Sequence, residues 1–126
     1  MDNIDEKKTI VVIEDEKDLC DMIKFELEAR GYKVITANNG VEAYRKIEGV
    51  NPDLIVLDLN MPQMGGLAFY EWVCDEKGEP RYPLFVLTAR ANAEELFENG
   101  KYKVAGFMEK PFETNKFLSE VKKIVK

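Results

Sequence analysis

Carboxylates are the leading candidates for chemistry in this sequence, because it contains no histidine. The lack of histidine excludes zincin-type metal sites, Ser-His-Asp and Cys-His catalysis, and a phosphohistidine on the chain itself. Glu14 and Asp15 follow one short apolar run, and Asp58 follows another. Taken alone, Glu14 and Asp15 could belong to the acidic first turn of a helix, and Asp58 could be a turn residue or a helix cap. Together they would repel one another unless a cation neutralised them, and Mg2+ suits a site made only of oxygen ligands.

A hydroxyl and an amine follow two later apolar runs. Thr88 directly follows the run 84–87, and Lys110 comes shortly after the run 104–108. Alone, Thr88 could be a strand residue or a helix cap, and a single lysine is usually solvated. Beside carboxylates, the hydroxyl can donate to an anionic oxygen and the ammonium can bind a carboxylate or a phosphate. A metal cation, a carboxylate nucleophile, a hydroxyl and an ammonium are the parts that phosphoryl transfer to an aspartate needs.

The segments that must position these side chains alternate between two kinds of pattern. Short apolar runs rich in β-branched residues predict strands at 9–13, 33–37, 54–57, 84–87 and 104–108. Amphipathic stretches predict five helices. The first ends near Gly31, and the second begins at Asn39 and closes at Asn51-Pro52. The other three run over 67–74, 92–99 and 114–125. The helix at 92–99 is only weakly amphipathic.

Five strands alternating with five helices predict an α/β fold. We expect a doubly wound, flavodoxin-like (βα)5 domain whose five-stranded parallel sheet has the order 2-1-3-4-5. The runs at 9–13, 54–57 and 84–87 are apolar throughout, as expected for a sheet that helices cover on both faces. In this topology the carboxyl ends of the first and third strands meet at the ligand crevice, so the acidic residues should converge there.

The length, charge and composition of the chain restrict the classes of function that it can have. The 126 residues fit one domain, 1–126, with residues 1–7 as a flexible tail. The net charge of −6 disfavours direct contact with nucleic acid, and no apolar run is long enough to span a membrane. The polar start argues against a secretory signal, so we expect a cytoplasmic protein. Cys20 and Cys74 are interpreted as buried or half-buried thiols without a partner.

Four motifs in a fixed order carry a resemblance to a known family. They are Glu14-Asp15, the run Asp58-Leu-Asn-Met-Pro-Gln-Met-Gly-Gly66, Thr88-Ala89 and Lys110-Pro111-Phe112, and Thr88 and Lys110 follow Asp58 by 30 and 52 residues. From about Lys8 to its end, the chain resembles the receiver domain of bacterial response regulators. The chemotaxis-type single-domain regulators are nearest in size. The resemblance implies a two-component phosphorelay and a signalling switch that assists its own phosphorylation and dephosphorylation, rather than an enzyme.

The resemblance also implies a role for each site residue. Asp58 resembles the phosphoacceptor, which takes the phosphoryl group from a phosphohistidine of a histidine kinase or phosphotransfer protein. Glu14, Asp15, Asp58 and the backbone carbonyl of Asn60 resemble the Mg2+ ligands. Lys110 resembles the cation that pairs with the phosphoryl oxygens, and its bond to Pro111 is expected to be cis.

Switching is the second function that the resemblance implies. Thr88 resembles the hydroxyl that moves toward the phosphoryl group, and Phe107 the aromatic residue that rotates inward with it. The surface formed by the fourth helix, fifth strand and fifth helix would then bind a downstream protein. No output segment follows Val125, so we expect the output to pass through another protein unless the chain is a fragment of a longer regulator.

Several positions depart from the commonest family pattern. Glu14 stands where aspartate is equally familiar, and Phe107 lacks the hydroxyl of a tyrosine. Asn60 and Arg90 occupy positions that tune the lifetime of the phosphoryl group in this family, which leaves that lifetime open.

Two other functions remain alternatives at this point. The first is a receiver-like interaction domain that binds its partner without phosphorylation. The second is a small Mg2+-dependent phosphohydrolase or a flavodoxin-like redox protein, although the acidic residues 14–16 would repel a flavin phosphate.

Overall fold

The computed structural model describes residues 7–59, 66–89 and 102–125. Five parallel strands form one sheet in the order β2-β1-β3-β4-β5. Their bounds are β1 Thr9–Ile13, β2 Lys33–Ala37, β3 Leu54–Asp58, β4 Leu84–Thr88 and β5 Gly106–Glu109. The predicted fold class and strand order are therefore confirmed. Of the predicted tail 1–7 only Lys7 is described, and the predicted helix at 92–99 lies outside the described residues.

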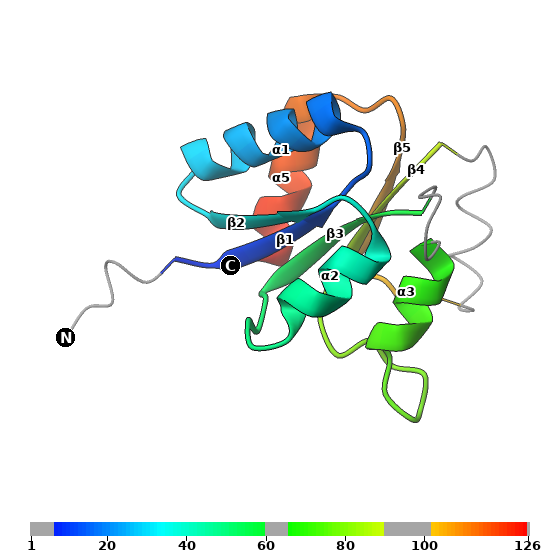
Figure 1. Cartoon of the computed structure of the whole chain (residues 1–126). Helices are drawn as coiled ribbons and strands as arrows, with labels where there is room; N and C mark the ends of the chain where they lie inside the picture. The colour runs from blue at the N-terminus through cyan, green and yellow to red at the C-terminus, as the bar shows by residue number, and fades with distance from the viewer. Residues whose placement is uncertain (1–6, 60–65, 90–101, 126) are drawn as a thin grey trace.

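Helices cover both faces of this sheet (Figure 1). On one face lie α1, Lys17–Ala29, and α5, Thr114–Ile124; on the other lie α2, Gly40–Ile47, and α3, Gly66–Val73. Strand residues point alternately to the two faces, so Ile10 and Val12 pack toward α1 and α5, whereas Val11 and Ile13 pack toward α2 and α3. This two-sided burial explains why the central strands are apolar throughout.

The start of α2 follows the sequence signals, but its end does not. The Asn39 side chain accepts a hydrogen bond from the Glu42 backbone N–H at 2.8 Å, as an N-cap should. The prediction that Asn51-Pro52 closes the helix is wrong, because the helix ends at Ile47 and Glu48 already has an extended backbone. Gly49 follows with φ of +86°, a conformation that glycine adopts without strain.

The first residues of the predicted fifth strand are also corrected. The apolar pattern predicts a strand over 104–108, whereas β5 runs from Gly106 to Glu109. At its far end, Glu109 pairs with Thr88 of β4, an exposed charged position that an apolar run cannot reveal. At its near end, the Ala105 backbone N–H donates to the Leu84 carbonyl of β4 at 2.8 Å, and a tyrosine holds the chain two residues earlier, at Lys103.

That tyrosine is Tyr70 of α3. Its hydroxyl accepts a hydrogen bond from the Lys103 backbone N–H at 2.7 Å and donates one to the Lys103 carbonyl at 2.9 Å. The ring of Tyr102 packs edge-on against the Tyr70 ring, with centroids 5.3 Å apart. One side chain therefore satisfies both backbone groups of a residue that precedes the edge strand, and fixes that segment to α3.

We expect Tyr70→Phe to lower the free energy of unfolding by about 1–3 kcal/mol, because two backbone groups of Lys103 lose their partner. Urea denaturation measures the change. Tyr82→Phe is the matched control, because the Tyr82 hydroxyl makes no hydrogen bond with the described residues and the ring is half-buried. Equal stability of the two variants would contradict this role for Tyr70.

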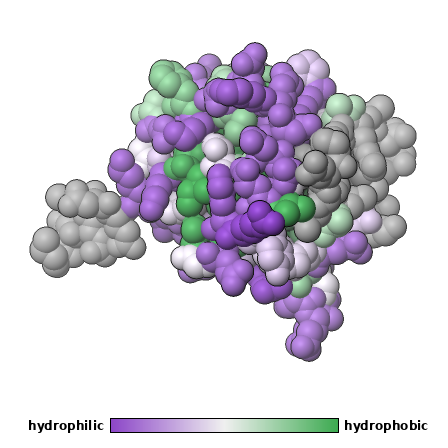
Figure 2. All heavy atoms as spheres, viewed as in Figure 1, coloured by the Kyte–Doolittle hydropathy of each residue, from purple (hydrophilic) through white to green (hydrophobic). Residues whose placement is uncertain are grey.

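The surface is mostly hydrophilic on the face that Figure 2 shows, with hydrophobic residues visible over the sheet between α1 and α2. Within the described ranges, no helix combines the length and apolar character that crossing a bilayer requires. Cys20 is buried and Cys74 half-buried, and neither forms a disulfide, as predicted.

Candidate functional site

The predicted site residues meet at the carboxyl ends of the central strands because the sheet register places them there. Glu14 directly follows β1, and Asp58 and Thr88 are the last residues of β3 and β4. Ile13 pairs with Leu57, which sets Glu14 beside Asp58 across neighbouring parallel strands. The Lys110 backbone N–H donates to the Thr88 carbonyl at 2.7 Å, which holds the lysine next to the same edge.

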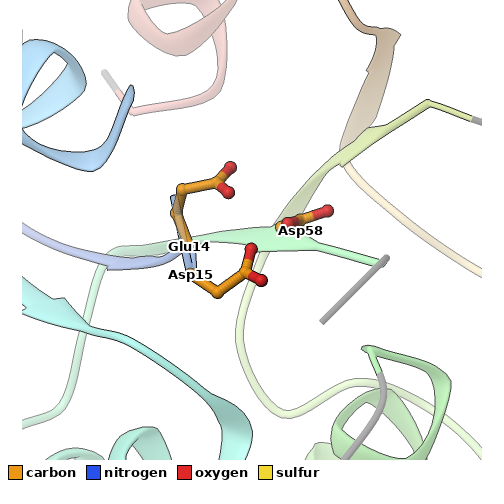
Figure 3. Close-up of side chains that lie close together, drawn as sticks. All are labelled: Glu14, Asp15 and Asp58. Carbon is orange, nitrogen blue, oxygen red and sulfur yellow. The ribbon is translucent and has the colours of Figure 1, made fainter. Parts of the chain in front are cut away.

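Three carboxylates form the centre of the site. One oxygen each of Glu14, Asp15 and Asp58 lies within 4.8 Å of the others. Figure 3 shows these side chains around one space at the adjacent ends of β1 and β3. Glu14 and Asp58 are each 1% exposed, whereas Asp15 is exposed. The cluster is thus closed by the protein on one side and open to solvent through Asp15.

Lys110 is the cation that contacts this cluster. Its Nζ lies 2.9 Å from Glu14 Oε1 and 3.3 Å from Asp58 Oδ2, and its side chain is only 19% exposed. Burial lowers the pKa of Lys110, but the contacts with Glu14 and Asp58 outweigh that effect and leave the pKa raised. The sequence predicted a pairing with one carboxylate, and the lysine contacts two. The predicted cis bond between Lys110 and Pro111 is confirmed.

Glu14 is held in an environment that resists its ionisation. Burial is the largest cause, and the neighbouring Asp58 charge adds to it, while Lys110 acts in the opposite direction; the pKa of Glu14 rises to about 7. Glu14 Oε2 accepts from the Glu16 backbone N–H at 3.2 Å. Oε1 is buried and forms an ion pair with Lys110, but accepts no well-angled hydrogen bond from the described residues.

These features fit a bound Mg2+. Among the described residues, the side-chain donors of this cluster are carboxylate oxygens, which hard divalent cations prefer. The buried Glu14 Oε1 accepts no hydrogen bond there, so a metal or a metal-bound water could satisfy it. A divalent cation would also offset the repulsion among the three carboxylates, which Lys110 neutralises only in part.

We expect the metal-free protein to lose stability as the pH rises from about 5 to about 8, on the order of 2 kcal/mol from Glu14 alone. Glu14 has a higher pKa in the folded state than its ordinary value of 4.5, so the folded protein binds the extra proton. That contribution is complete below the ordinary value and is lost as the pH passes the folded value near 7. Urea unfolding at several pH values measures it.

Glu14→Gln is the test of that assignment, with Glu48→Gln as a control at an exposed position. The difference in stability between wild type and Glu14→Gln should grow with pH in favour of the variant, and saturating Mg2+ should reverse it by binding the wild-type site. A difference that does not change with pH would show that Glu14 does not titrate in this range.

The remaining predicted residues have different outcomes. Thr88 is fully buried at the end of β4. Phe107 on β5 is half-buried and packs against the core beneath α2 and α3. Asn60, whose carbonyl is a predicted metal ligand, and Arg90 lie outside the described residues. The contact of Lys110 with two carboxylates could not be predicted from the sequence. The spacing places the Lys110 backbone at this edge of the sheet, but it does not determine that the ammonium lies close to both Glu14 and Asp58.

Comparison with known proteins decides the family. The family model of the response regulator receiver domain matches residues 10–122. The chain belongs to this family. Receiver domains are signalling switches of two-component systems rather than classical enzymes, and this receiver domain therefore falls in that class.

Individual relatives resemble the receiver domain along nearly its whole length. It is 33% identical over 121 residues to the alkaline phosphatase synthesis transcriptional regulatory protein PhoP of Bacillus subtilis, covering 94% of this chain and 49% of that one. It is 28% identical over 118 residues to the polar-differentiation response regulator DivK of Brucella anthropi, covering 91% and 94%. The chain thus spans about half the length of the first relative and almost all of the second.

Solved structures share the fold. The non-phosphorylated HemR receiver domain of Leptospira biflexa superposes with a TM-score of 0.83 at 32% identity, covering 94% of both chains. The chemotaxis protein CheY4 of Vibrio cholerae has a TM-score of 0.82 at 27% identity, covering 94% of this chain and 99% of its own. The response regulator TrrA of Thermotoga maritima, solved with Mg2+ and BeF, has a TM-score of 0.77 at 30% identity, covering 93% and 98%.

Proposed function

We propose that this receiver domain accepts a phosphoryl group on Asp58 from a histidine kinase or phosphotransfer protein, with Mg2+ bound by Glu14, Asp15 and Asp58. The observation that carries the proposal is the convergence of these three carboxylates with the Lys110 ammonium at one edge of the sheet. The solved structure of TrrA with Mg2+ and BeF supports it, because that relative binds a metal and a fluoride complex together.

The proposed phosphoryl transfer follows from the positions of the Asp58 carboxylate and the Lys110 ammonium. A carboxylate oxygen of Asp58 attacks phosphorus and forms a new P–O bond, while the P–N bond to the donor histidine breaks and its electron pair stays on nitrogen, which takes up a proton. Bound Mg2+ would draw negative charge from the phosphoryl oxygens. Lys110 lies 3.3 Å from Asp58 Oδ2 before transfer, so its ammonium is in place to pair with a phosphoryl oxygen after it.

The proposed switch links this site to the surface through β4 and β5. Thr88 is buried beside Asp58 and, at the end of β4, its hydroxyl would turn toward the phosphoryl group. Phe107 lies on the neighbouring strand, paired with Val86, and would rotate as Thr88 leaves its place. Two packings of these side chains would present two surfaces to a downstream protein near β5 and α5. A cytoplasmic location accords with this exchange.

The test is reaction with acetyl phosphate and Mg2+, followed by intact mass measurement. We expect one phosphoryl group on wild type, none on Asp58→Asn, and none when a chelator removes the metal. Asp21→Asn is the matched control, since it makes the same change at an exposed aspartate of α1.

A folded wild-type protein that takes no phosphoryl group, or an Asp58→Asn variant that takes as much as wild type, would overturn the proposal. The first of these results would favour the alternative of a receiver-like interaction domain that acts without phosphorylation. Release of phosphate from added phosphoesters with turnover would instead favour a hydrolase.

A further inference from the structure

A groove lies between the end of α1 and the helix α5. Its volume is about 390 Å3, and the residues that line it are Arg30, Tyr32, Asn115, Leu118, Ser119 and Lys122. α1 begins next to the acidic site and leads back to the start of β2, which is parallel to β1. Arg30 and Tyr32 therefore lie at the edge of the sheet where the strands begin, opposite to Asp58. The groove is thus separate from the proposed phosphorylation site.

The polar side chains that line this groove are all able to donate hydrogen bonds. They are a guanidinium, an ammonium, an amide and two hydroxyls, and none of these six residues is acidic, although acidic residues outnumber basic ones in the chain by 24 to 18. Asn115, Ser119 and Lys122 are exposed and follow one another at helical spacing, so they share one face of α5. Within the described part of the chain, the side chains of these three residues make no hydrogen bond or ion pair. Their donors are therefore available to a ligand.

Arg30 is held in place by its own helix. Its Nη1 donates to Glu26 Oε1 at 3.2 Å and to the Glu26 carbonyl at 3.3 Å. Among the described residues, Nη2 and Nε make no hydrogen bond, so the oriented guanidinium keeps donors for a ligand. Because Glu26 offsets part of the Arg30 charge, Lys122 is the larger source of attraction for an anion in this groove.

The floor of the groove is apolar. Leu118 is only 6% exposed, and the half-buried Tyr32 packs against the same core cluster between the sheet, α1 and α5. An apolar or aromatic group that entered the groove would meet these two side chains beneath the ring of donors. An apolar floor with a few polar groups that converge on it is the usual composition of a small-molecule site, and the volume lies in the usual range.

We propose that this groove binds a phosphomonoester that carries a small apolar or aromatic group. The phosphate oxygens would accept hydrogen bonds from Lys122, Ser119 and Arg30, and the organic group would lie on Tyr32 and Leu118. Two cations and three neutral donors match a phosphate dianion with three terminal oxygens better than a carboxylate with two. A soluble phosphate ester and the headgroup of phosphatidic acid both present this group.

Titration of the full chain with phenyl phosphate, followed by amide NMR shifts, tests the soluble source. A chelator is present, so that no metal draws the phosphate to Asp58. We expect shifts at Ser119 and Lys122, and binding at least about fivefold tighter for phenyl phosphate than for inorganic phosphate or phenol. Equal affinity for phenyl phosphate and inorganic phosphate would show an adventitious ion only and overturn the inference.

Matched variants separate the groove from general attraction to lysines. Lys122→Gln should weaken binding of phenyl phosphate by about fivefold to tenfold. Lys123→Gln removes the same charge one residue further on, from a lysine that pairs with Glu120 at 3.2 Å and does not line the groove, and should change the affinity by less than about twofold. Equal loss in the two variants would contradict the assignment, as would loss of binding in Asp58→Asn, which would place the ligand at the acidic site.

Cosedimentation with phosphatidylcholine vesicles, with and without phosphatidic acid, tests the lipid source. Binding that needs both phosphatidic acid and Lys122 would support the site and assign its ligand to a membrane surface. Binding of phenyl phosphate that depends on Lys122, without binding to either vesicle, would support the site and assign its ligand to solution. A folded wild-type protein that binds neither phenyl phosphate nor the vesicles would overturn the inference.

Discussion

Replacing Lys110 by methionine is expected to slow phosphorylation of Asp58 by about a hundredfold to a thousandfold. The ammonium lies 2.9 Å from Glu14 and 3.3 Å from Asp58, in a setting where it is only 19% exposed. Its removal leaves the phosphoryl oxygens without the ammonium as a partner during transfer, so that only bound Mg2+ would offset their charge in the proposed site. Because Lys110 lowers the pKa of Glu14, its loss also favours protonated Glu14 and weakens Mg2+ binding.

The measurement is the rate of adduct formation with acetyl phosphate at saturating Mg2+, which separates the loss of the ammonium from weaker metal binding. Lys116→Met is the control, because it removes the same charge from an exposed position on α5. A rate for Lys110→Met close to that of the control would contradict the proposed role of the ammonium.

Phe85→Ala should lower the free energy of unfolding by about 3–5 kcal/mol. Phe85 lies in the middle of β4, is 0% exposed and packs on Phe117 of α5, with ring centroids 5.4 Å apart. Its truncation would leave a cavity where the sheet meets the helix, at a site bounded on both sides by strands. Because β4 carries Thr88 at its end, this packing also positions the site.

Urea denaturation of wild type and Phe85→Ala measures that effect. Phe25→Ala makes the same change on α1, where the side chain is 70% exposed, and should alter stability by no more than about 0.5 kcal/mol. Similar unfolding midpoints for the two variants would contradict the assignment of Phe85 to the core.

Much of the fold could be predicted because the burial of the central strands is directly visible in their sequences. Central strands covered on both faces need apolar residues at every position, so 9–13 and 54–57 stand out in the sequence. Parallel strands joined by right-handed crossovers leave few topologies, and each one aligns the strand ends. The convergence of Glu14 with Asp58 followed from that alignment.

What the sequence could not supply depends on contacts between distant residues. Glu14 is buried and Asp15 is exposed, although they are acidic residues next to each other and no local pattern distinguishes them. The hydrogen bonds of Tyr70 with Lys103 join residues 33 apart, and no local pattern marks them. The early end of α2 depended on Gly49, a weaker signal in the sequence than the proline that follows it.

The most direct test of the central claim is to locate the phosphoryl group on the wild-type chain. Borohydride reduces an aspartyl phosphate to homoserine, so treatment after reaction with acetyl phosphate and Mg2+ marks the acceptor permanently. Peptide mass spectrometry should find homoserine at position 58 and at no other aspartate, and none when the metal is chelated. Reduction at Asp15 or another carboxylate, or no reduced residue in a folded protein, would contradict the assignment of Asp58 as the phosphoacceptor.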